Sequence, residues 1–179
     1  ALLLLGLLCA NFTVLADTNN FSNKINNFSF QFYQQFANNS SNLAFSPYGV
    51  VSLLTMLYPG AVGNTQTEIG NTLGFSMPQQ SLSDFKQLTM SFMPTSTEGG
   101  AFNFASAFWV MNGIAINTQY SQTLSGLLYG QIRQADFQNN PNAAVTDINS
   151  WVATQTQNHI TNLVNLKMIT PDTRIIAVN

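Results

Sequence analysis

One segment constrains the fold more than any other: residues 50–58, VVSLLTMLY, are apolar on nearly every side of the helix that they would form. Ser46-Pro47 precedes this segment and is a typical helix start, because a serine at the N-cap accepts a hydrogen bond from an orphan amide and proline has no amide hydrogen to leave unpaired. A helix that is apolar all round is buried. The sequence therefore predicts a helix from Pro47 that runs through the middle of a large domain.

Helices and strands alternate on both sides of this segment. Five apolar side chains at helical spacing predict an amphipathic first helix: Phe21, Ile25, Phe28, Phe32 and Phe36. Further helices are expected over residues 64–73, 81–93 and 119–130 and after Asn140-Pro141, and strands over residues 43–45, 101–111 (with Ile114 and Ile116 as an extension), 132–137 and 173–179. No repeat or low-complexity linker divides these elements, so the sequence predicts one continuous α+β domain.

Three short signals refine the expected boundaries. Thr65-x-x-Glu68 has the form of a capping box at the start of the third helix, and Gly74 is expected to end it. Asn112-Gly113 is a turn dipeptide.

Charge excludes one class of partner. Only 7% of the residues are charged, five basic against seven acidic, and the formal net charge is -2. No basic surface is available to follow phosphates, so we expect no nucleic-acid partner. The polar surface must instead consist largely of Asn and Gln.

Residues 1–16 are interpreted as a partial secretory signal peptide. The apolar run from Ala1 is too short to cross a bilayer, which takes about 20 residues, and Val14 and Ala16 are small residues ahead of a plausible cleavage site before Asp17. The alternative is a short buried helix. The signal interpretation predicts a secreted, extracellular protein, or a periplasmic one in a bacterium, without stable membrane insertion.

The cysteine count agrees with a chain that relies on its core. Cys9 is the single cysteine and lies within the expected signal, so the mature chain would have no disulfide and no thiolate ligand for a metal. Four Asn-x-Ser sequons are either glycosylation sites or chance matches in an Asn- and Ser-rich sequence: Asn20, Asn27, Asn38 and Asn39.

No catalytic constellation is apparent, and we expect no enzyme activity, metal or cofactor. His159 is the single histidine and is interpreted as a residue at the end of a helix, close to free carbonyls. The carboxylates are scattered: Asp17, Glu68, Asp84, Glu98, Asp136, Asp147 and Asp172. Trp109 and its aromatic neighbours lack interleaved basic residues, so they indicate a core rather than a base-stacking surface. These observations favour a protein that inhibits another protein, binds a ligand or has a structural role.

An ordered series of motifs resembles the serpin family. N-x-x-F-S-P at Asn42–Pro47 is followed by the apolar helix, by G-A-V-G-N-T-Q-T-E-I at Gly60–Ile69, and then by L-G-F. Further matches follow in family order: AFWV from Ala107, ADF from Ala135, INSWV from Ile148 and TRIIAVN from Thr173. The resemblance implies helices A to F with strands 2 and 1 of sheet A and the opening of strand 3. Residues 17–179 would then be the N-terminal part of a single serpin domain, whose C-terminal part with the reactive loop is absent from this chain.

The resemblance implies suicide inhibition of a serine protease, in which the cleaved reactive loop inserts into sheet A as an added strand. The full-length protein is expected to be a monomer. Alternatives are a cysteine-protease inhibitor with the same mechanism and a non-inhibitory serpin that acts as a carrier, chaperone or storage protein. An amide-rich structural protein would rest on composition alone.

The resemblance also implies particular site residues. Asn42, Ser46 and Asn179 match the polar shutter region beneath sheet A, although Gly49 stands where the family usually has a second serine, and Ser46 could act as an N-cap alone. The region that resembles helix D, roughly Gln79–Met93, holds one basic residue, so we expect no activation by heparin.

Overall fold

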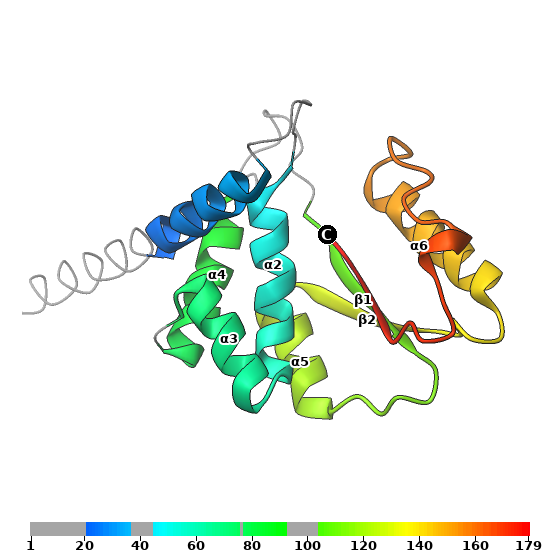
Figure 1. Cartoon of the computed structure of the whole chain (residues 1–179), viewed down its shortest axis with the longest axis horizontal. Helices are drawn as coiled ribbons and strands as arrows, with labels where there is room; N and C mark the ends of the chain where they lie inside the picture. Colours follow the sequence, from blue (N-terminus) through cyan, green and yellow to red (C-terminus); the bar gives the residue numbers. More distant parts are fainter. Residues whose placement is uncertain (1–20, 37–44, 76, 93–103) are drawn as a thin grey trace, which may run out of the picture. The chain divides into compact units, whose positions relative to one another are not determined.

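The computed structural model describes residues 21–36, 45–75, 77–92 and 104–179 (Figure 1). They form two compact units, one within residues 1–95 and one within residues 96–179.

The first unit is helical. Residues 21–36 form a helix, as the aromatic spacing predicts. They are followed by α2 (Pro47–Leu57), the 3-10 turn η1 (Tyr58–Gly60), α3 (Gly63–Leu73) and α4 (Pro78–Phe92). Phe21 is buried in an aromatic cluster, with its ring centroid 5.7 Å from that of Phe75 and 6.5 Å from that of Phe85. Edge-to-face and offset contacts of this kind stabilise a core beyond the area they bury.

Helix α2 has the start and the burial that the sequence predicts. The Ser46 hydroxyl accepts a hydrogen bond from the amide of Gly49 at 3.1 Å, and Pro47 is the first helical residue. Every residue of α2 is buried or half-buried, and Val51 and Met56 are almost completely enclosed. The apolar pattern is therefore used for packing all round the helix.

The expected capping box of α3 is wrong. The helix begins at Gly63, the N-cap is Val62, and no side chain bonds to it. Gly63 has φ +59°, which lets the chain turn into the helix before Thr65, and a threonine already inside the first turn cannot serve as N-cap. Gly74 does end the helix in the left-handed region at φ +70°, as expected.

The second unit contains a mixed three-stranded sheet in the order β2-β1-β3. Strand β1 (Ser106–Met111) pairs in parallel with β2 (Gly130–Ala135) and antiparallel with β3 (Ile175–Val178). Helix α5 (Thr118–Leu127) makes the crossover that parallel strands require. Its start is capped by Asn117, whose side chain accepts from the amide of Tyr120.

Helix α6 (Pro141–Gln155) follows β2 and packs on the sheet (Figure 1). The Asn140 side chain caps α6 by accepting a hydrogen bond from the amide of Ala143 at 3.3 Å. The helix start predicted at Asn140-Pro141 is therefore also confirmed. A short turn, η2 (Leu166–Met168), precedes β3. Helices and a mixed sheet together confirm the predicted α+β class.

Several boundaries differ from the expected ones. Strand β1 starts at Ser106, and Ile114 and Ile116 do not extend it, because the chain turns away at Asn112-Gly113 with φ +86° at the glycine. Helix α4 begins three residues early, at Pro78. The strand expected over residues 43–45 falls mostly outside the described residues.

Candidate functional site

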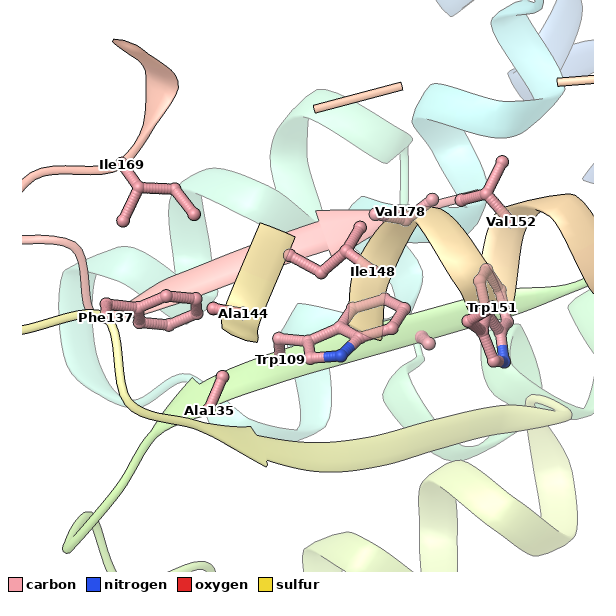
Figure 2. Packing of buried hydrophobic residues seen from close by; sticks show 10 residues of the cluster. Trp109, Ala135, Phe137, Ala144, Ile148, Trp151, Val152, Ile169 and Val178 are labelled. Carbon is pink, nitrogen blue, oxygen red and sulfur yellow. The ribbon is translucent and has the colours of Figure 1, made fainter. Parts of the chain in front are cut away.

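The candidate site is the layer formed by α6 and the three strands beneath it. Side chains alternate across the sheet, so residues paired in register share a face. Ala107 lies opposite Val178, and Trp109 lies opposite Ile176, and these side chains pack in the cluster that α6 covers. Figure 2 shows Ile148 and Trp151 of α6 beside Trp109. The helix thus contacts both β1 and the edge strand β3.

One carboxylate links α6 to two strands. Asp147 Oδ2 accepts a hydrogen bond from Trp109 Nε1 at 2.6 Å and one from Arg133 Nε at 3.1 Å, and its Oδ1 accepts from Arg133 Nη2 at 2.8 Å. The guanidinium carbon of Arg133 also lies 5.8 Å from the centroid of the Trp109 ring, within reach of a cation–π interaction. The carboxylate is therefore held by a bidentate arginine and by a buried indole at the same time.

The electrostatics follow from this geometry. The hydrogen bond from Arg133 lowers the pKa of Asp147 below its ordinary value, partial burial opposes the shift, and the Trp109 N–H bond and the arginine charge add to the lowering. The Trp109 side chain is fully buried, whereas the Asp147 and Arg133 side chains keep 42% and 39% of their surface exposed. Solvent screening makes this ion pair weaker than a buried one.

A second indole strengthens the same contact. The rings of Trp109 and Trp151 meet edge to face, with centroids 5.2 Å apart and an interplanar angle of 82°. Trp151 Nε1 donates to Gln131 Oε1 at 3.3 Å, so α6 is also bonded to β2 one turn beyond Asp147. Both tryptophans therefore have a partner for their polar atom, as large aromatic residues usually do when buried.

Asn149 joins α6 to the chain that leads to β3. Its Oδ1 accepts from the amides of Leu163 and Val164 at 2.9 and 3.0 Å, and its Nδ2 donates to the Val164 carbonyl at 2.9 Å. Ile169, further along this connection, is buried in the cluster under α6. The connection between α6 and β3 is thus bonded to the helix and packed against the sheet.

Strand β3 is an edge of the described sheet. It pairs with β1 on one side, and no strand of the described residues pairs with it on the other. Ile175 is 48% exposed, while Val178 at the opposite end is buried. The Asn179 side chain donates to the Ser106 hydroxyl at 2.7 Å, which ties the end of β3 to the start of β1.

The comparisons identify the family. The profile described as Serpin (serine protease inhibitor) matches residues 23–179. The chain belongs to the serpin family. It is 33% identical to an uncharacterized serpin-like protein of Thermococcus kodakarensis, over 88% of this chain and 37% of the relative, and 32% identical to serine protease inhibitor A3B of Mus musculus, over 77% and 34%.

Solved serpin structures have the same fold. Human thyroxine-binding globulin superposes with a TM-score of 0.80 at 25% identity, covering 90% of this chain and 44% of that one. The chain therefore spans less than half the length of the serpins that it matches.

The expected shutter residues are described only in part. Ser46 caps α2, and Asn179 bonds to Ser106. These two residues belong to different compact units, and Asn42 lies outside the described residues. Gly49 is buried and donates its amide to Ser46. The shutter assignment stays a prediction.

Sequence reasoning missed Asp147, which it counted among scattered carboxylates. Its partners lie 14 and 38 residues away, so only the fold brings them together. The one local signal is that Asp147 and Trp151 are four residues apart and share a face of α6. His159 lies exposed in the turn after α6, where its backbone amide donates to the Thr156 carbonyl at 2.9 Å.

Two kinds of feature are absent from the described residues. No three His, Cys, Asp or Glu side chains in the described ranges are grouped so that they could hold a metal ion. In the same ranges, no helix has the length and hydropathy needed to cross a membrane.

Proposed function

We propose that the full-length protein carrying this chain is a secreted serpin that inhibits a serine protease by strand insertion. The observation that carries the proposal is the match of residues 23–179 to the family described as Serpin (serine protease inhibitor). The mixed sheet, with α6 packed on one face, is the part of the fold that would receive the strand.

The chemistry follows from strand addition. The protease serine attacks a carbonyl of the exposed reactive loop, the peptide bond breaks, the new amine leaves, and the loop stays bound to the serine as an ester. The freed loop then pairs with an open sheet edge through its backbone and buries alternate side chains. If insertion is faster than hydrolysis, the ester is carried away from a working active site and remains uncleaved.

Several further assignments belong to this proposal. Residues 1–16 act as a signal peptide, residues 17–179 are the N-terminal part of one serpin domain, and the whole protein is a monomer. Asn42, Ser46 and Asn179 exchange hydrogen bonds as the sheet opens. The reactive loop lies in the part of the protein that this chain does not contain.

The test is the stability of the loop-cleaved protein. Insertion of a new central strand should raise the thermal unfolding midpoint well above that of the intact protein, because it adds a hydrogen-bonded ladder and buries apolar side chains. Limited proteolysis followed by calorimetry measures this. A cleaved protein that melts at the same temperature as the intact one would favour a non-inhibitory serpin.

One observation favours the alternative that the protein is a non-inhibitory serpin. The human thyroxine-binding globulin that this chain resembles is a binding protein by name, and it has the same fold over the matched region. A cysteine protease as the target would leave the insertion mechanism unchanged. Incubation with proteases of both classes separates these two alternatives from the main proposal.

A further inference from the structure

We propose that Asn112 is a site of spontaneous deamidation, and that the isoaspartate formed there loosens the end of β1. Of the 22 asparagines in the chain, Asn112 alone is followed by glycine. Glycine has no Cβ to keep its backbone nitrogen away from the preceding side chain. The chemistry needs only the chain and water, so it does not depend on whether the full-length protein is an inhibitor.

The reaction is a ring closure followed by hydrolysis. The backbone nitrogen of Gly113 attacks the side-chain amide carbon of Asn112, a carbon–nitrogen bond forms, and ammonia leaves with the proton of the Gly113 amide. Water then opens the succinimide ring at either carbonyl. One product is aspartate, which keeps the original main chain. The other is isoaspartate, in which the main chain runs through the former side chain. Neither step needs an oxidant or a cofactor.

Both reacting groups are accessible to solvent. Asn112 and Gly113 are exposed, and among the described residues no hydrogen bond is made to the Asn112 side chain. The turn is closed by the Ile114 amide, which donates to the Met111 carbonyl at 3.2 Å, whereas the Gly113 amide donates to no described residue. A Cβ at Gly113 would meet no atom within 4 Å apart from its chain neighbours. Neither sterics nor a hydrogen bond therefore holds the nitrogen away from the Asn112 side chain.

Asn149 shows what protects an asparagine. It is followed by the small residue Ser150, but its Oδ1 accepts from the amides of Leu163 and Val164, and its Nδ2 donates to the Val164 carbonyl. Ser150 lies inside α6, where the backbone amides form the helical ladder. Both groups needed for ring closure are thus occupied, so Asn149 serves as an internal reference for Asn112.

The turn slows the reaction without preventing it. Gly113 has φ +86°, and the ring can close only after the backbone rotates away from this geometry. One hydrogen bond closes the turn, and exposed turns open locally at a small cost in free energy. We expect Asn112 to react about tenfold more slowly in the folded protein than in a short peptide, as for the opening of one backbone hydrogen bond.

The position of the turn gives isoaspartate a structural effect. The Asn112 amide donates to the Ala135 carbonyl at 2.9 Å, and the Met111 amide donates to the Arg174 carbonyl at 2.9 Å, just before β3. These bonds hold the end of β1 between its two neighbours. Isoaspartate adds a methylene carbon to the main chain immediately before Gly113, so the turn can no longer keep the register of the bonds on both sides of it. The end of β1 then opens more often.

The experiment ages the full-length protein at mildly alkaline pH. Tandem mass spectrometry of proteolytic fragments locates each converted asparagine, and an isoaspartate methyltransferase labels the rearranged product. Asn112→Gln is the variant that blocks the reaction, because glutamine keeps the amide but must close a larger and slower-forming ring. We expect conversion at Asn112, none at Asn149, and no isoaspartate at this turn in Asn112→Gln.

Hydrogen exchange measures the effect on β1. Deamidation adds a negative charge, so anion exchange separates the converted protein from the unconverted one. Asn112→Asp is the matched control, because it has the new carboxylate on an unaltered main chain. We expect the Met111 and Asn112 amides to exchange about tenfold faster in the isoaspartate form, as for the loss of one hydrogen bond, and at the wild-type rate in Asn112→Asp.

Each part of the proposal has a contrary result. No conversion of Asn112 under conditions that convert a synthetic peptide of residues 110–116 would overturn the modification site. Equal conversion of Asn112 and Asn149 would overturn the role of the exposed turn. Unchanged exchange in the isoaspartate form, or equally fast exchange in Asn112→Asp, would overturn the effect of the lengthened main chain on β1.

Discussion

Two buried threonines in the helical unit differ in one respect. Thr55 of α2 and Thr89 of α4 are both fully buried. The Thr89 hydroxyl donates to the Phe85 carbonyl at 2.8 Å and lies 2.6 Å from the hydroxyl of Tyr48, whose pKa burial raises to about 12. The Thr55 hydroxyl has no hydrogen-bond partner among the described residues. A buried polar group without a partner costs free energy, whereas a satisfied one contributes to stability.

This difference predicts opposite effects of one substitution. Thr55→Val should raise the free energy of unfolding by about 1 kcal/mol, because it replaces an unsatisfied hydroxyl by a methyl of the same shape. Thr89→Val should lower it by about 1 kcal/mol, because the hydrogen bond between the Thr89 and Tyr48 hydroxyls is lost. Urea denaturation of the full-length protein measures both. Equal changes in the same direction would contradict this account of the two sites.

The contacts of Asp147 are an example of side-chain interactions that could not be predicted from the sequence. A motif search considers only the residues close to a carboxylate in the chain. Nothing near Asp147 in the sequence indicates that it binds Arg133 and Trp109. The bonds to Arg133 and Trp109 exist because β1 and β2 are parallel neighbours and α6 packs on them. Long-range pairing of this kind is decided by packing and not by local preference.

At the scale of elements, local chemistry predicts most starts and stops. Ser46-Pro47 and Asn140-Pro141 begin α2 and α6, and Gly74 ends α3, because each signal satisfies orphan backbone groups within a few residues. Thr65 failed as a cap because Gly63 changed the backbone path just before it. No local sequence signal predicts the register in which β1 pairs with β2 and β3. The register depends on which side chains of the strands pack under α6.

The anchoring of α6 should weaken in acid. The pKa of Asp147 is lowered in the folded protein, so its stabilising effect is present above the unfolded value of about 3.9 and is lost as the pH falls through the folded value. Arg133 on β2 is the charged side chain in contact with it among the described residues, and β1 contributes the uncharged Trp109.

Melting curves of wild type and Asp147→Asn measure this effect. Wild type should melt higher at neutral pH, and the gap should narrow as the pH falls below about 4. A gap that stays constant down to strongly acidic pH would mean that the ionised carboxylate does not hold α6.

At the scale of the whole molecule, the small number of charged residues predicts that the protein does not bind heparin. Lys86 is the one basic residue of α4, the helix that corresponds to helix D in the family resemblance, and the chain has a net charge of -2. A sulfated polysaccharide needs a cluster of basic side chains. The full-length protein should pass through a heparin column at physiological salt. Retention on the column would contradict this prediction.

We propose that the full-length serpin traps a protease by inserting its cleaved loop into the sheet that contains β1, β2 and β3. The most direct measurement is incubation of the full-length protein with trypsin-like, chymotrypsin-like and elastase-like proteases, followed by denaturing electrophoresis. We expect a band of combined mass that survives SDS with at least one of them, and the same protease inactivated by a catalytic-serine substitution should give none. Clean cleavage of the loop by every protease tested, without any such band, would contradict it.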